Sequence, residues 1–207
     1  MKKNKEKDTL VPFNFDKLLN IIPELKINDL VLDNISIKTP VDSSNMNPKI
    51  WIEIVLIIKK YYEKYNGFVI LHGTDTMAFT ACALSFMLEG INKAIILTGS
   101  QIPINARRSD AKENLITSIE IANSGKVHEV CVFFEDKLYK GNRTTKVNTE
   151  DFEAFKSPNH PTLARAGVNI KYSDYLQKKK EQELIVHTKI SHDVMILKLF
   201  PGISIKI

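Results

Sequence analysis

The chain has 207 residues, which suits one domain of ordinary size, and its 43% hydrophobic content can bury a core, so a disordered chain is not expected. The formal net charge of +5 comes from 29 Lys and Arg against 24 Asp and Glu, and the basic residues are spread along the chain, which argues against a nucleic-acid groove. Two basic clusters, Lys2 to Lys7 and Lys178 to Lys180, are interpreted as a solvated terminus and a solvated loop.

The same composition predicts a soluble cytoplasmic protein without a membrane anchor. No run approaches the roughly eighteen apolar residues of a membrane span, and Met1 to Asp8 are charged where a signal peptide is apolar. Cys82 and Cys131 lie in apolar runs without metal-ligand spacing. We interpret them as buried thiols in a reducing compartment.

The first clear element along the chain is an amphipathic helix. Asn47 is a candidate N-cap, Pro48 suits the first helical position, and apolar residues recur at helical spacing from Trp51 to Tyr65. Asn66-Gly67 ends this helix. The apolar run from Phe68 to Leu71 is typical of a strand buried on both faces.

Two further strand and helix pairs complete the pattern. The expected elements are a helix over 76–89, a strand over 94–97, a helix capped by Ser109 or Asp110 and closed by Ser124-Gly125, and a strand over 130–134. Two consecutive βαβ units predict right-handed crossovers. The fold class is therefore α/β, with a doubly wound, mostly parallel sheet of the Rossmann or flavodoxin-like kind. Further along, Leu184 to Ile190 and Val194 to Phe200 predict a closing strand pair.

Two loops follow the predicted strands where such a sheet binds ligands. His72 to Thr76 and Thr98 to Pro103 both carry glycine and hydroxyl residues, and ligands lie beyond the carboxyl ends of parallel strands. A plainer interpretation exists for each loop, a helix cap for the first and a tight turn for the second. His72 itself is interpreted as structural.

Five separated motifs resemble those of the type I, bacterial-style L-asparaginases, in the order of that family. The motifs are Asp42-Ser-Ser-Asn-Met46, Gly67-Phe-Val-Ile-Leu-His-Gly-Thr-Asp-Thr-Met77, Leu97-Thr-Gly-Ser-Gln-Ile-Pro103, Arg108-Ser-Asp110 and Gly141-Asn-Arg-Thr-Thr-Lys146. The resemblance covers the chain from about Pro12 to Ser204. It implies an amidohydrolase that converts L-asparagine to L-aspartate and ammonia through a threonine acyl-enzyme, without metal or organic cofactor.

The resemblance also implies roles for individual residues. Thr74, Asp75 and Lys146 match the catalytic Thr-Asp-Lys set. Lys146 would accept a proton, Thr74 would be the hydroxyl or would orient water, and Asp75 would fix the lysine and hold the substrate's α-ammonium. Because a lysine acts as a base only when neutral, the proton transfer must be concerted or closely timed.

Four more residues match the substrate-binding positions. Asp42, Ser43 and Ser44 match the segment that grips the substrate's carboxylate, and Ser100 would line the pocket near the leaving amide. Without the resemblance, the first three would be interpreted as a turn that leads into the helix at Pro48.

The sequence departs from the family at both ends. The family's first strand ends in Thr-Gly-Gly-Thr-Ile and holds its principal nucleophile; this run is absent, and Thr9 is not assigned its role. The family's smaller carboxyl-terminal domain has no match either. We therefore expect 1–190 to be the amino-terminal catalytic domain and 191–207 to begin a linker. Either the sequence is incomplete or the chain is a truncated paralogue, and the intact Thr-Asp-Lys set favours the first explanation.

The resemblance implies a homodimer or homotetramer that acts on a small molecule and binds neither nucleic acid nor membrane. Two alternatives remain, a module that binds an amino acid without turnover and the related amidotransferase subunit that supplies ammonia for tRNA amidation. The residues of the motif Thr-Gly-Ser-Gln-Ile-Pro make the amidotransferase the weaker alternative.

Overall fold

The computed structural model describes residues 2–3, 10–11, 21–25, 30–37, 41–179 and 181–204. Thr9, Lys180 and most of the cluster from Lys2 to Lys7 lie outside the described residues. Lys178 and Lys179 are exposed, as expected for a solvated loop. No helix in the described part of the chain has the length and apolar character needed to cross a membrane.

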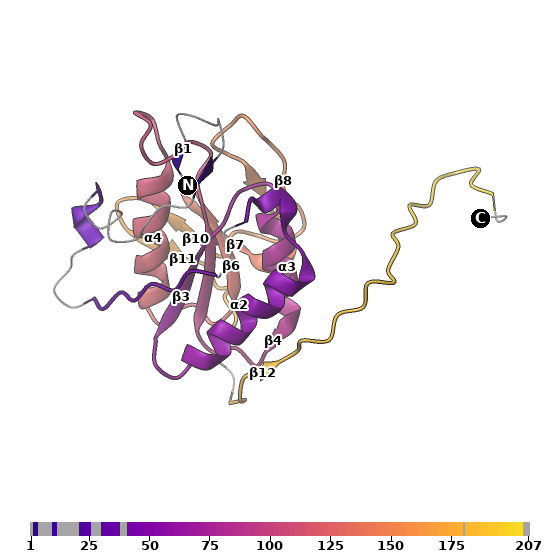
Figure 1. The fold of residues 1–207 in the computed structure, drawn as a ribbon, viewed down its shortest axis with the longest axis horizontal. Coiled ribbons are helices and arrows are strands. Elements are labelled where there is room, and N and C mark those ends of the chain that lie inside the picture. Colours follow the sequence, from indigo (N-terminus) through magenta and orange to yellow (C-terminus); the bar gives the residue numbers. More distant parts are fainter. Residues whose placement is uncertain are drawn as a thin grey trace.

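A six-stranded sheet forms the centre of the molecule, in the order β11-β10-β7-β6-β5-β3 (Figure 1). Its strands are β3 (Gly67–Leu71), β5 (Ala94–Thr98), β6 (Val130–Phe134), β7 (Lys137–Lys140), β10 (Ala164–Ala166) and β11 (Ile170–Tyr172). β3 pairs with β5 and β5 with β6 in parallel, whereas the other three pairings are antiparallel.

The α/β class is confirmed, but the sheet is mixed rather than mostly parallel. The difference arises directly after β6, where a turn at Glu135 and Asp136 leads straight into β7. Glu135 has a positive φ of 59°, which suits a two-residue hairpin turn. Such a turn reverses the chain, so β7 has to run antiparallel to β6.

The described part of the chain includes the α-helices α2 (Pro48–Tyr61), α3 (Met77–Met87) and α4 (Ala111–Asn123). The predicted cap of α2 is confirmed, since Asn47 Oδ1 accepts from the backbone N of Lys49 at 3.1 Å. At α4 the hydroxyl of Ser109 accepts from Ala111 N at 3.1 Å, whereas the Asp110 side chain makes no capping hydrogen bond. Asp110 is used elsewhere, as described below.

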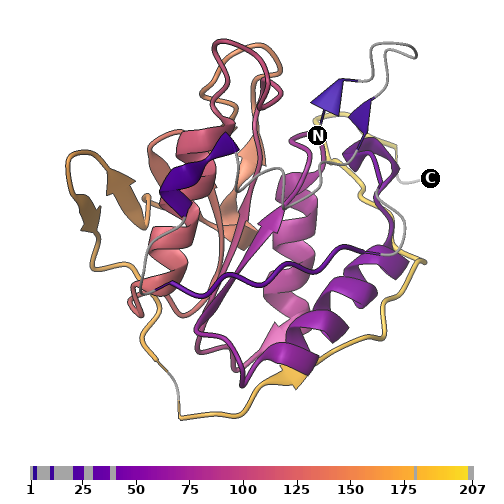
Figure 2. The same ribbon diagram turned by 60° about the vertical axis from the view of Figure 1, so that its left-hand side comes forward.

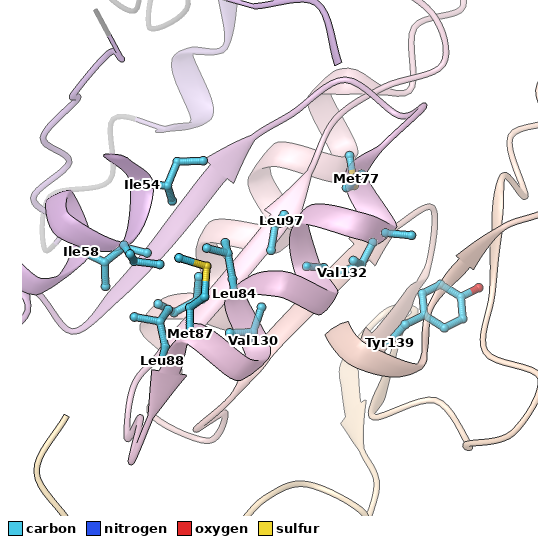
Figure 3. Packing of buried hydrophobic residues seen from close by; sticks show 14 of the residues in the cluster. Ile54, Ile58, Met77, Leu84, Met87, Leu88, Leu97, Val130, Val132 and Tyr139 are labelled. Atoms are coloured by element: carbon cyan, nitrogen blue, oxygen red, sulfur yellow. The ribbon is translucent and has the colours of Figure 1, made fainter. Parts of the chain in front are cut away.

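The helices cover both faces of the sheet, which makes it doubly wound; Figure 2 shows α4 on one side and α2 with α3 on the other. Side chains alternate along a strand, so Ile95 and Leu97 of β5 join the core under α2 and α3, while Ile96 joins the core under α4. Figure 3 shows the first of these cores. Of the two free cysteines, Cys131 is buried as expected, and Cys82 is only half-buried.

Several short elements are not part of the six-stranded sheet. They are β1 (Lys2–Lys3) with β2 (Leu10–Val11), β4 (Leu88–Glu89) with β12 (Ile185–Val186), β8 (Thr145–Lys146) with β9 (Phe155–Lys156), and the 3-10 turns Pro23–Leu25, Ser43–Asn45 and Gly141–Arg143.

The expected closing strand pair is wrong. Ile185–Val186 pairs with Leu88–Glu89 instead of with the segment from Val194 to Phe200. That later segment carries no strand, its apolar side chains are exposed, and it runs away from the body of the molecule (Figure 1). An apolar run can predict a strand, but a strand also needs a partner, and none of the described residues offers one to this segment.

Candidate active site

The loop after β3 and the loop after β5 lie side by side at the carboxyl edge of the sheet, because the two strands are parallel and directly paired. His72 N donates to Thr98 O at 2.8 Å and ties the two loops together. A side chain at Gly99 would overlap the carbonyl of His72, so this close approach requires glycine. Thr74 and Asp75 follow immediately in the first loop.

Lys146 reaches this edge from a separate part of the chain. It lies in β8, which follows the 3-10 turn that packs against α3. Its Nζ lies 2.8 Å from Thr74 Oγ1 and 2.7 Å from Asp75 Oδ1. The lysine side chain is only 14% exposed, whereas that of Asp75 is 60% exposed. The fold thus brings a hydroxyl, a carboxylate and a largely covered amine together from positions 71 residues apart.

The segment with Asp42, Ser43 and Ser44 packs directly against the Thr74 loop. Thr76 Oγ1 donates to the backbone O of Ser43 at 2.6 Å. A Cβ added at Gly73 would lie 2.5 Å from the Ser43 hydroxyl, so the two segments touch. Ser43 is buried in this contact, while Asp42 and Ser44 are exposed. The structure therefore places all three beside the candidate catalytic set.

Asp42 also has a local structural role. Its Oδ1 accepts from the backbone N of Ser44 at 2.9 Å and from the Ser44 hydroxyl at 2.8 Å. The backbone hydrogen bond, followed by the hydroxyl, lowers the pKa of the Asp42 carboxyl. The carboxylate thereby caps the turn Ser43–Asn45, which agrees with the plainer interpretation of this segment.

Ser100 is half-buried in the loop after β5, and its side chain makes no hydrogen bond to any residue that the structure describes. Its neighbour Gln101 instead contacts the catalytic set: Thr74 Oγ1 donates to Gln101 Oε1 at 3.0 Å. Sequence reasoning missed Gln101, although it belongs to the same motif as Ser100. The signal available was its place in the loop, where an amide offers both a donor and an acceptor.

Sequence reasoning also missed the contacts that Asp110, directly before α4, and Asn114, within α4, make with the loop after β5. Asp110 accepts from the backbone N of Gln101 and of Ile102, both at 3.0 Å. Asn114 is 1% exposed; its Nδ2 donates to Gly99 O at 3.0 Å, and its Oδ1 accepts from Glu135 N at 2.9 Å. Together the two side chains hold the loop after β5 and join it to the loop after β6.

His72 has both ring nitrogens occupied by structural contacts. Nδ1 lies 2.6 Å from Gly73 O and Nε2 lies 2.8 Å from Thr80 Oγ1, which in turn accepts from Trp51 Nε1 at 3.0 Å. Gly73 O can only accept, so Nδ1 carries the proton and Nε2 accepts from the threonine. Burial lowers the pKa of His72, which keeps the ring neutral.

Residues 1–178 match the family model described as "Asparaginase, N-terminal". The chain therefore belongs to this family of asparaginase amino-terminal domains. In the described parts of the chain, no group of three or more His, Cys, Asp or Glu side chains lies close enough to hold a metal ion.

Several relatives agree with this assignment. The chain is 44% identical over 193 residues to "L-asparaginase 1" of Escherichia coli K12, covering 92% of the chain and 57% of that protein. It is 46% identical over 164 residues to a "60 kDa lysophospholipase" of Mus musculus, covering 78% of the chain and 29% of that protein. The crystal structure of L-asparaginase I from Vibrio cholerae superposes with a TM-score of 0.87 at 40% identity, covering 98% of this chain and 62% of that one. The chain thus spans less than two thirds of each of these relatives.

Proposed function

We propose that the chain is the amino-terminal, catalytic part of an L-asparaginase, an amidohydrolase that converts L-asparagine to L-aspartate and ammonia. The observation that carries the proposal is the pair of contacts from Lys146 Nζ, 2.8 Å to Thr74 Oγ1 and 2.7 Å to Asp75 Oδ1. The L-asparaginase names of two close relatives support the same reaction.

The three groups suit the activation of a threonine hydroxyl. An alcohol becomes a nucleophile when a base removes its proton, and Lys146 Nζ lies within reach of Thr74. A lysine accepts a proton only as the neutral amine, a form that burial favours and the Asp75 carboxylate opposes. We therefore propose a concerted step, in which the proton moves to Nζ while Oγ1 bonds to the side-chain amide carbon of asparagine.

The rest of the reaction follows from this step. The C–N bond of the amide breaks as the lysine returns a proton to the nitrogen, which leaves as ammonia. A water molecule then hydrolyses the threonine ester, giving L-aspartate and the free hydroxyl. We assign Asp75 to the substrate's α-ammonium, because 60% of its side chain remains exposed while one oxygen contacts Lys146.

We further propose that the segment of Asp42, Ser43 and Ser44 holds the substrate's carboxylate through its hydroxyl and backbone N–H groups, with Asp42 fixing the turn, and that Ser100 faces the leaving amide. The contact of Ser43 with Gly73 and the exposed hydroxyl of Ser44 support the first assignment. Hydroxyls and loop N–H groups suit an anion that has to be oriented before reaction. The Ser100 hydroxyl supports the second assignment, because it is half-buried and makes no hydrogen bond to any described residue.

The location and assembly that we propose follow the family resemblance, a cytoplasmic homodimer or homotetramer without metal or organic cofactor. We place the domain boundary near residue 190, because β12 ends at Val186 and the side chains from Val194 to Phe200 are exposed. Light scattering of the purified chain gives its assembly state, and a mass corresponding to the monomer at micromolar concentration would contradict the proposal.

An ammonia-release assay with L-asparagine tests the reaction itself. We expect release by this chain and a loss of about 100-fold or more in both Thr74→Ala and Lys146→Met. Binding of L-asparagine without ammonia release would instead identify a module that binds an amino acid without turnover.

A further inference from the structure

The side chain of Gln101 joins separate segments of the candidate active site. Its Oε1 accepts from Thr74 Oγ1 at 3.0 Å, and its Nε2 donates to the backbone O of Thr149 and of Asp151, each at 3.0 Å. Thr149 and Asp151 belong to the loop that directly follows Lys146. Gln101 therefore contacts the hydroxyl and the segment that carries the amine at the same time.

The two carbonyls decide which end of the Gln101 amide faces Thr74. Carbonyl oxygens only accept, so both protons of Nε2 are used there and Oε1 is left for Thr74. Because Oε1 also only accepts, Thr74 gives its single hydroxyl proton to Gln101. Lys146 can then contact Thr74 only by donating to a lone pair of Oγ1, which is the contact observed at 2.8 Å.

The backbone of Gln101 is held as firmly as its side chain. Asp110 accepts from Gln101 N and Ile102 N with its two oxygens, and Asn114 holds the carbonyl of Gly99. These contacts come from the start of α4, behind the loop. The backbone from which the Gln101 side chain extends is therefore fixed in place.

We propose that Gln101 is a positioning residue that holds Thr74 Oγ1 in register with the Lys146 amine, so that the hydroxyl proton has only to turn from Oε1 to the neutral amine when the reaction begins. The inference rests on the proposed function, since it concerns the step in which Thr74 and Lys146 act. A displacement of about 1 Å in a reacting group can lower a rate by about 100-fold, so fixing Oγ1 between an amide and an amine acts on kcat rather than on substrate binding.

Steady-state ammonia release by Gln101→Met tests this role, because methionine has a similar length and neither donates nor accepts in the same way. We expect kcat to fall by about tenfold to 100-fold while KM stays within about twofold. In a crystal structure of the variant we expect Thr74 Oγ1 to lie beyond about 3.5 Å from Lys146 Nζ, outside hydrogen-bond distance. An unchanged kcat, a rise in KM alone, or an unmoved Thr74 would each overturn the inference.

Gln101→Glu gives a second readout that loss of packing does not produce. The carboxylate keeps an acceptor for Thr74 but sets an oxygen against the carbonyls of Thr149 and Asp151. Its negative charge favours the ammonium form of Lys146, so the acid limb of the kcat profile should move to higher pH. A wild-type kcat and an unmoved acid limb in this variant would contradict the inference.

Gln177→Met is the matched control. Gln177 is also half-buried and also donates from Nε2 to a backbone carbonyl, that of His128 at 3.1 Å, but it lies near the opposite ends of the strands. Its kcat should equal that of the unchanged chain. If the chain releases no ammonia, or Lys146→Met releases as much as the unchanged chain, the proposed function fails, and the position of Thr74 in the Gln101→Met crystal structure alone decides the inference.

Discussion

Polar side chains gather at both ends of β5 and β6, but they bind different kinds of partner. At the carboxyl ends, the Thr74 hydroxyl contacts the side chains of both Gln101 and Lys146. At the amino ends, Glu129 binds the amine of Lys140 and the backbone N of Gln177. The arrangement at the carboxyl ends leaves a hydroxyl and an amine next to each other. The arrangement at the amino ends neutralises a buried carboxylate and links β7 to the segment around Gln177.

This contrast suggests a division of work between the two ends. Groups at the carboxyl ends are partly open to solvent, as the 60% exposure of the Asp75 side chain shows, and can exchange a protein partner for a substrate. Glu129 is 4% exposed and cannot make such an exchange without unfolding. Substitutions at the carboxyl ends should therefore change turnover, and those at the amino ends should change stability.

The largest expected effect comes from Lys146→Met. Removal of the amine leaves Thr74 without its base, so ammonia release should fall by about 100-fold to 10,000-fold. The free energy of unfolding, measured by urea denaturation, should change by less than about 1 kcal/mol, because the partner carboxylate of Asp75 is solvent-exposed. A variant that unfolds much more readily would show that Lys146 supports the fold and would break the comparison.

For Lys140→Met, at the amino ends of the strands, we expect the opposite result, a change in stability rather than in turnover. It leaves Glu129 buried without its cation, 2.6 Å away in the structure, which should cost about 3 kcal/mol of unfolding free energy in the same urea experiment. Ammonia release per folded molecule should equal that of the unchanged chain. If turnover falls as far as in Lys146→Met, the two ends do not differ in the way described.

Asn114→Ala sharpens the comparison, because Asn114 lies at the carboxyl ends but is buried. The change leaves Gly99 O and Glu135 N without their hydrogen-bond partners. We expect the free energy of unfolding to fall by about 2 kcal/mol, and turnover to fall because the loop is displaced. Thr117→Ala, on the same helix and only half-buried, is a suitable control. Equal stability of the two variants would contradict a clamping role for Asn114.

The smallest expected effect concerns the pH dependence of stability. The pKa of His72 is lowered in the folded chain, so below about pH 6.5 the unfolded chain takes up a proton that the folded chain does not. Stability is thus present at neutral pH and falls as the pH drops, by up to about 1.4 kcal/mol per pH unit from this group. His72→Gln should flatten the dependence below about pH 6.5, as followed by thermal unfolding; an unchanged slope would contradict it.

The parallel half of the sheet could be predicted from the sequence because its signals are local. The strand β6 is an unbroken apolar run at Val130–Phe134, and α2 begins at a proline that follows its cap. The antiparallel half has no such signals: Lys137–Lys140 and Ala164–Ala166 are short and mix charged with apolar residues. The turn at Glu135 reverses the chain and places Lys137–Lys140 beside β6, and Ala164–Ala166 then pairs with Lys137–Lys140.

The candidate site also contains residues that could be predicted from the sequence and residues that could not. Thr74, Asp75 and Lys146 could be chosen from the sequence because each lies in a motif of the family, and the structure brings them within hydrogen-bond distance. The roles of Gln101 and Asn114 depend on which backbone carbonyls lie near their amides. An asparagine inside a helical pattern gives no sign that two loops flank it, so these contacts could not be derived before the fold was known.

The single tryptophan of the chain has a useful place in this arrangement. Trp51 donates to Thr80, Thr80 contacts His72, and His72 precedes the Gly73-Thr74 turn. The indole is thus two hydrogen bonds from the ring at the base of the candidate site. Its fluorescence therefore offers a built-in optical reporter, without any label, of protonation and movement at that loop.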